Sequence, residues 1–320
     1  MATQRALDLQ ADDMIARENQ LANLTALNEF AKAKEMADHD LQHNSADTAE
    51  YRQYLLPLFF LLGDHAAVQQ ELDWAVGKPE EYLMINNAAL IRQSQGGYRD
   101  ADALYQKAFD QAEQQKLPDV AAGILLSRAQ GKALAGMCND VPGLVKQALS
   151  LDKSKITVRV AGLPAALCGE AKLAMPLLEE LQKKFPRDTL TNTLYFPQAR
   201  AADELAHNHP DQALHDLEAM GSYNLISQQE YLRGLAYLDL KNGAAAAEAF
   251  RKVIAAKGAH LSQGLQDYPQ AQLGLARALA MQGDSAGAKQ AYHEFFNTWK
   301  DADPDLPQLV QAKGEFSALK

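Results

Sequence analysis

The densest group of potential metal ligands in this 320-residue sequence comprises Glu204, His207, His209, Asp211 and His215. A His-x-His pair beside carboxylates has the donor atoms that a divalent transition metal prefers. The same segment, HNHPD, is also typical of a turn between two helices, with Pro210 at the first position of the second helix. No second group of ligating residues fixes a geometry around it. We therefore interpret the cluster as a solvated turn, and keep a metal-dependent protein as the alternative.

Three aspartates in the DADPD segment, residues 301–305, have the D-x-D-x-D spacing that opens an EF-hand loop. That loop also needs a glycine at its sixth position and a glutamate at its twelfth, where this chain has Leu306 and Ala312. Pro304 and Pro307 favour the end of one helix and the start of another. We expect no calcium and no metal here.

Motifs for enzymatic chemistry are missing from the chain. It has no phosphate-binding glycine loop, zinc-protease motif, nucleophile elbow or protein-kinase signature. We therefore expect a non-enzyme with no catalytic residues and no cofactor.

The overall composition excludes further classes. The 31 Lys and Arg against 41 Asp and Glu give a net charge of −10, which argues against nucleic-acid binding. The longest apolar run, residues 54–63, is about half of what a membrane span needs. The charged N-terminus lacks the apolar stretch of a secretory signal.

Helices must position these residues, because the chain is rich in Ala, Leu, Gln, Glu and Lys and its apolar residues recur at helical spacing. The stretch GDHAAVQQELDWA, residues 63–75, aligns with GGYRDADALYQKA, residues 96–108, with Val68 and Ala101 at equivalent positions 33 residues apart. The pattern resembles the tetratricopeptide repeat, a helix–turn–helix unit of about 34 residues. We predict an all-α fold, a right-handed α-solenoid of tetratricopeptide-type helix pairs.

We expect about seven helix pairs in one continuous domain, since no linker divides residues 1–320. The expected pairs cover residues 49–80, 82–115, 119–151, 155–187, 189–222, 227–258 and 269–299. We assign residues 1–46 to N-terminal capping helices, expected near 8–22 and 26–43, residues 47–302 to the repeats, and residues 303–320 to a C-terminal capping helix. Small residues at the crossing points, such as Gly234 with Ala246, should let paired helices approach closely. Pro57 and Pro164 should each kink the first helix of the pair in which they lie.

Cys138 and Cys168 occupy similar turn positions of successive units and have no CxxC spacing. Equivalent positions in a solenoid are about 9–10 Å apart, whereas a disulfide needs Cα atoms within about 7 Å. This favours two free thiols, with a disulfide as the alternative if the chain lies outside the cytosol.

Charge is unevenly distributed along the chain. Residues 121–188 hold ten basic and six acidic residues, a local charge of +4, whereas residues 1–120 hold ten basic and twenty acidic residues, a local charge of −10. This arrangement could steer an acidic partner to the middle of the array. The alternative is solvated helix faces with no dedicated partner.

A protein or peptide partner is expected on the concave surface formed by the first helices of the pairs. The repeat frame places polar and aromatic side chains there, and Tyr and Arg are common interface anchors. The partner-binding candidates are Asn86, Gln93, Arg159, Tyr195, Gln198, Tyr231 and Arg277.

The C-terminal part of the chain supports a narrower resemblance. TWKDADPDLP, residues 298–307, precedes a helix of the form AK-x-E-[FY]-x-x-L, and repeat-like sequence covers residues 227–297. This region resembles the C-terminal repeats of bacterial receptor-type serine/threonine protein kinases and of related winged-helix regulators. The resemblance extends over residues 80–320, but the kinase domain and membrane segment are missing.

The kinase resemblance implies a non-catalytic sensor or interaction region in an extracytoplasmic, periplasmic location. The alternatives are the ligand-sensing domain of a winged-helix transcriptional regulator and a stand-alone cytoplasmic adaptor.

Overall fold

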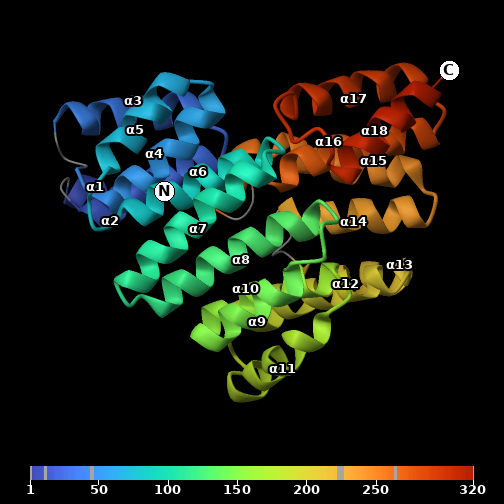
Figure 1. Ribbon diagram of the computed structural model, residues 1–320, viewed down its shortest axis with the longest axis horizontal. Helices are drawn as coiled ribbons and strands as arrows, with labels where there is room; N and C mark the ends of the chain where they lie inside the picture. The colour runs from blue at the N-terminus through green and yellow to red at the C-terminus, as the bar shows by residue number, and fades with distance from the viewer. Residues whose placement is uncertain (1, 11–12, 44–46, 222–226, 263–264, 320) are drawn as a thin grey trace.

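The computed structural model describes residues 2–10, 13–43, 47–221, 227–262 and 265–319. These residues form eighteen α-helices with short 3-10 and π-helical turns, and no β-strand occurs among them. Consecutive helices pack against each other as pairs joined by short turns (Figure 1). The predicted all-α solenoid is therefore confirmed.

Seven helix pairs form the body of the stack. They are α4 (Ala49–Leu62) with α5 (His65–Ala75), α6 (Glu81–Ser94) with α7 (Tyr98–Gln114), α8 (Pro118–Leu134) with α9 (Val141–Leu151), α10 (Lys155–Leu167) with α11 (Met175–Lys184), α12 (Phe196–Ala206) with α13 (Pro210–Glu218), α14 (Ser227–Asp239) with α15 (Gly243–Ala255), and α16 (Asp267–Met281) with α17 (Ser285–Thr298).

One backbone feature repeats in every pair. A residue with left-handed conformation follows each first helix and reverses the chain toward the second helix. These residues are Gly63, Gly96, Gly136, Gly169, Asn208, Lys241 and Gly283. The regularity shows that the seven pairs share one local design, although their sequences differ.

Elements outside the pairs differ in part from expectation. The N-terminal segment forms three helices, α1 (Ala2–Leu9), α2 (Met14–Ala26) and α3 (Phe30–Gln42), where two were predicted. Short turns η1 (Ala171–Leu173), η2 (Thr191–Tyr195) and η4 (Lys257–Ser262) precede α11, α12 and α16, and α18 (Pro307–Ala318) ends the chain. Pro57 and Pro164 lie inside α4 and α10 as expected.

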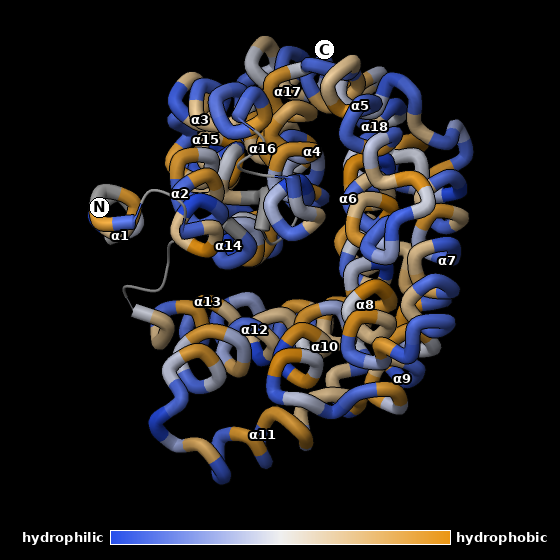
Figure 2. Tube along the Cα trace, turned by 90° about the vertical axis from the view of Figure 1, so that its left-hand side faces the viewer, coloured by the Kyte–Doolittle hydropathy of each residue, from blue (hydrophilic) through white to orange (hydrophobic). Residues whose placement is uncertain are grey.

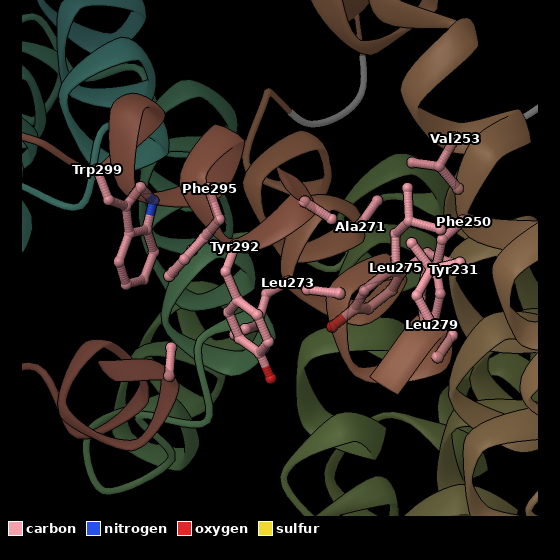
Figure 3. Close-up of a cluster of buried hydrophobic side chains, with 14 of the residues drawn as sticks. Tyr231, Phe250, Val253, Ala271, Leu273, Leu275, Leu279, Tyr292, Phe295 and Trp299 are labelled. Carbon is pink, nitrogen blue, oxygen red and sulfur yellow. The ribbon is translucent and has the colours of Figure 1, made fainter. Parts of the chain in front are cut away.

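Small residues bring the helices of a pair together. Ala246 is fully buried, and a Cβ atom added to Gly234 would lie 2.5 Å from the Phe250 ring. Phe250 is itself fully buried in the largest apolar cluster, together with Tyr292 and Phe295 (Figure 3). Close helix contact at small residues in this pair thus leaves room for the large Phe250 side chain.

The stack of pairs closes on itself. The first helix of the last pair, α16, contacts α6, and η4 contacts α2 and α4. In Figure 2 the first helices α6, α8, α10, α12, α14 and α16 follow one another around a circle. The largest apolar cluster, formed mostly by residues after Tyr231, also includes Tyr98 and Leu134. The array is therefore a ring in which C-terminal units pack against N-terminal ones, and the sequence did not indicate this.

The segment 299–306, which we name the closure segment, joins the two ends of the ring. Trp299 Nε1 donates a hydrogen bond of 3.1 Å to the Ser94 carbonyl, and the Arg99 backbone N–H donates one of 3.0 Å to Asp303. The Arg99 guanidinium also pairs with Asp305 at 2.5 Å. Two aspartates of the DADPD motif thus bind the start of α7.

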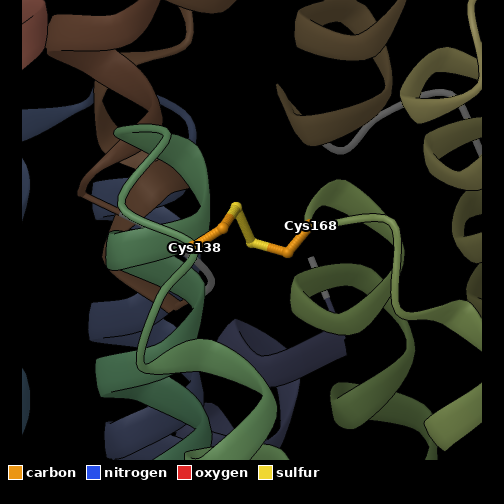
Figure 4. Close-up of a disulfide and its surroundings, with 2 residues drawn as sticks. All are labelled: Cys138 and Cys168. Carbon is orange, nitrogen blue, oxygen red and sulfur yellow. A yellow bond between two sulfur atoms is a disulfide. The ribbon is translucent and has the colours of Figure 1, made fainter.

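The expectation of two free thiols is wrong. Cys138 and Cys168 form a disulfide with a Cα–Cα distance of 5.4 Å (Figure 4). Six residues separate α8 from α9, and this long turn carries Cys138 beyond the end of α8. Cys168 directly follows α10, which packs against α8. The nominal spacing between units therefore does not apply at this edge.

Candidate partner-binding surface

The predicted partner-binding residues lie on six elements of the ring. Gln93 on α6 is fully buried, and its side-chain oxygen accepts hydrogen bonds of 3.0 Å from Tyr105 Oη and from Gln266 Nε2. A Cβ atom on Gly131 of α8 would lie 2.0 Å from the Gln93 amide. Gln93 therefore fills the junction of α6, α8 and the segment before α16, and its amide bonds across the ring closure.

Gln198 and Tyr231 are also internal. Gln198 on α12 is 2% exposed and donates a hydrogen bond of 2.8 Å to Gln228. Tyr231 on α14 is 5% exposed, with its ring 6.0 Å from that of Phe250. Burial and then the charge of Asp267 raise the pKa of Tyr231 above its usual range, so its hydroxyl stays protonated. Both side chains hold neighbouring units together.

Arg159 and Tyr195 contribute to the junction between α10 and α12. Arg159 is 8% exposed, and its Nε donates a hydrogen bond of 2.8 Å to Thr191 Oγ1. Its guanidinium forms an ion pair with Asp188 and lies 5.8 Å from the centre of the half-buried Tyr195 ring. Arg159 thus joins α10 to η2.

Asn86 and Arg277 retain polar atoms without a hydrogen bond among the described residues. These atoms are Asn86 Oδ1 and Arg277 Nη2, both buried. Arg277 Nε nevertheless pairs with Glu315 of α18 at 2.9 Å, and Tyr292 donates to the same carboxylate oxygen. The binding role of the seven candidates stays a prediction; Asn86, Tyr195 and Arg277 are the half-buried ones among them.

Asp188 concentrates the charge of the α10–α12 junction. Lys155 at 2.7 Å, the backbone N–H of Thr191 and the Arg159 guanidinium together hold the pKa of Asp188 well below its usual range, although burial acts in the opposite direction. The charged form is therefore the one that the fold stabilises.

We expect Asp188→Asn to lower the free energy of unfolding by about 2 kcal/mol at pH 7, because hydrogen bonds to a charged group are lost. Since folding depresses the Asp188 pKa, its stabilisation is complete above about pH 4 and is lost as the pH falls through the folded-state value. Urea unfolding midpoints at pH 7 and in steps below pH 4 measure this. The exposed Asp211→Asn serves as control; an Asp188→Asn deficit that persists undiminished as the pH falls would contradict the assignment.

The histidine cluster lies at the turn between α12 and α13. His209 Nδ1 is 2.9 Å from a Glu204 carboxylate oxygen, His207 Nδ1 is 2.8 Å from the Asp203 carbonyl, and Pro210 begins α13 as predicted. Across the described ranges, no three His, Cys, Asp or Glu side chains are grouped so as to hold a metal ion.

A group of exposed cations lies beside this junction. Lys155 and Asp188 connect the loop before α10 to the loop before η2, so these loops lie side by side. These loops and the end of α11 present a set of exposed basic side chains for which we find no carboxylate partner in the described part of the chain. We name this set the basic edge; its members are Lys153, Lys183, Lys184 and Arg187.

The local positive charge of this region was visible in the sequence, but the basic edge was not. Four other cations of the same segment form internal ion pairs: Arg128, Lys132, Lys155 and Arg159. Only the fold separates these ion-paired cations from the exposed ones of the basic edge.

Comparison with known proteins gives similarity to solved structures and no match in sequence. No protein-family model matches the chain, and no curated protein matches it either. Among solved structures, the crystal structure of the P58(IPK) TPR domain aligns with a TM-score of 0.32 and 13% identity, covering 96% of this chain and 98% of that chain. Within the described residues, no helix is both long and apolar enough to cross a bilayer.

Proposed function

We propose that this protein is a non-catalytic, protein-binding repeat scaffold and the sensor region of a bacterial receptor-type serine/threonine kinase. The observation that carries the scaffold role is the basic edge, since four exposed cations without a carboxylate partner among the described residues lie together on a chain of net charge −10. An acidic protein surface is the partner that complements it.

The disulfide between Cys138 and Cys168 supports an extracytoplasmic location. Disulfides persist in oxidising compartments such as the periplasm and are rare in the bacterial cytosol. This observation favours the receptor over the stand-alone cytoplasmic adaptor, whose repeats would face reducing conditions.

Fractionation of the source cells tests the receptor assignment. An antibody against this chain should detect a membrane-bound polypeptide much larger than 35 kDa. In intact cells, a membrane-impermeant cross-linker should join it to a second protein, because the repeats lie outside the cytoplasm. A soluble band at 35 kDa would instead make the chain a stand-alone adaptor and refute the receptor assignment.

The variant K183Q/K184Q/R187Q tests the partner surface in the same cells. We expect it to reduce the yield of the cross-linked product by about tenfold, the effect of roughly 1.4 kcal/mol of lost charge attraction. The matched control R251Q/K289Q/K313Q removes the same charge elsewhere and should leave the yield unchanged. Equal yields for both variants would show that the basic edge is not the docking surface.

A further inference from the structure

A pocket of about 270 Å³ lies where the ends of the ring meet. Its walls come from four segments that are distant in sequence: residues 60, 61 and 65, residues 94 and 95, residues 257, 265, 268 and 269, and residues 297, 298, 300 and 301. The last segment includes the first residues of the closure segment. The pocket therefore exists only while the ring is closed, and it is separate from the basic edge.

One part of the pocket wall is apolar. Phe60 and Leu61 come from the end of α4, and Leu265, Tyr268 and Pro269 from the start of α16. Leu265 is 7% exposed and Pro269 is buried, so these side chains are fixed by packing. Such a wall suits the apolar body of a small organic molecule.

Another part of the wall is cationic. Lys257 and Lys300 both line the pocket, and neither has a carboxylate within ion-pair distance in the part of the chain that the structure describes. Lys257 Nζ lies 5.7 Å from the centre of the Tyr268 ring, which keeps the ammonium next to the apolar wall. His65 adds a third basic side chain, and Asp301 is the one carboxylate of the lining.

Two ammonium groups against one carboxylate leave a positive surplus beside an apolar wall. Ser94, Gln95 and Asn297 add hydroxyl and amide groups. The volume lies just below the range of about 300–1,000 Å³ that is usual for small-molecule sites, which suits a small ligand and is too small for a folded partner. We propose that this pocket binds a small organic carboxylate with an apolar body, its carboxylate between Lys257 and Lys300 and its body against Leu265 and Tyr268.

Binding at this place has a consequence for the ring. Because the ligand would contact residues from both ends of the array, it binds the closed form and not the open one. Ligand binding therefore stabilises closure by mass action. This inference does not depend on the kinase assignment, and its failure would leave the basic edge untouched.

Calorimetry with three acids and their matched alcohols tests the proposal. The probes are indole-3-acetate, 4-methylpentanoate and octanoate, each compared with the alcohol of the same carbon skeleton. We expect at least one acid to bind, and its alcohol to bind about tenfold more weakly because the alcohol lacks the charge. Binding of no acid, or equal binding of acid and alcohol, would overturn the proposal.

The variant K257Q/K300Q locates the binding. It should weaken binding of the acid about tenfold and leave binding of the alcohol unchanged. K289Q/K313Q should change the affinity for neither compound. Circular dichroism of the ligand-free variants establishes that both are folded. An acid that binds K257Q/K300Q as well as the unaltered protein would refute the assigned site.

Discussion

Replacing Trp299 with alanine should lower the free energy of unfolding by about 3–5 kcal/mol, the usual cost of removing a buried large aromatic side chain. Trp299 is 2% exposed, and its ring lies 4.8 Å from that of Phe295 and 6.3 Å from that of Tyr98. Its indole N–H donates to the buried Ser94 carbonyl, which alanine would leave without a partner. Packing and a hydrogen bond across the junction are lost together.

The same substitution should open the ring. A Cβ atom added to Gly96 would lie 3.0 Å from the Trp299 ring and 2.5 Å from Ala302, so the α6–α7 turn and the closure segment fit each other tightly. Small-angle X-ray scattering should show an increased maximum dimension for Trp299→Ala. Trp299→Phe keeps an aromatic ring and loses the N–H, so its stability in urea should fall between those of the unaltered protein and Trp299→Ala. A loss below about 1 kcal/mol for Trp299→Ala would show that closure contributes little.

The double variant Cys138→Ser/Cys168→Ser should be less stable by about 2–4 kcal/mol. The bridge closes a loop with a sequence separation of 30 residues, and cross-linking a loop of that length restricts the unfolded chain by this amount. It also connects the ends of α8 and α10, the first helices of successive units.

Urea unfolding with and without reductant measures this contribution. Reductant should lower the midpoint of the unaltered protein to that of the double variant, and should not affect the variant itself. Equal midpoints for the two proteins without reductant would mean that the cysteines are unpaired. Non-reducing peptide mapping should recover the peptides of Cys138 and Cys168 as one species.

The helix pairs could be predicted from sequence because their determinants are local. The spacing between Val68 and Ala101, and the turn glycines such as Gly63 and Gly96, specify a helix, a reversal and a second helix. Pro304 and Pro307 likewise indicated an end and a restart, and α17 ends at Thr298 while α18 begins at Pro307. These signals act within one unit.

Closure of the ring could not be predicted because it sums small rotations over seven units, and no single residue encodes a rotation. Gln93 and Gln266 are 173 residues apart, and nothing in either neighbourhood indicates that their amides meet. The repeat frame placed Gln93, Gln198 and Tyr231 on the inner side of the array. The same inner side supplies the contacts between units, which is why these residues are buried.

The prediction that Cys138 and Cys168 are free thiols was wrong for a different reason. The average spacing between units was applied at one of the longer turns of the array, where the chain extends past its helix. An estimate from regular geometry holds only where the geometry is regular.

Closure changes how the array transmits mechanical strain. In an open solenoid each unit contacts only its neighbours, so a load applied at one end must pass through every interface in series. Here the hydrogen bonds and ion pair of the closure segment provide a second path in parallel. The array therefore resists stretching as a rigid frame until the closure segment releases, and extends as a spring only after that.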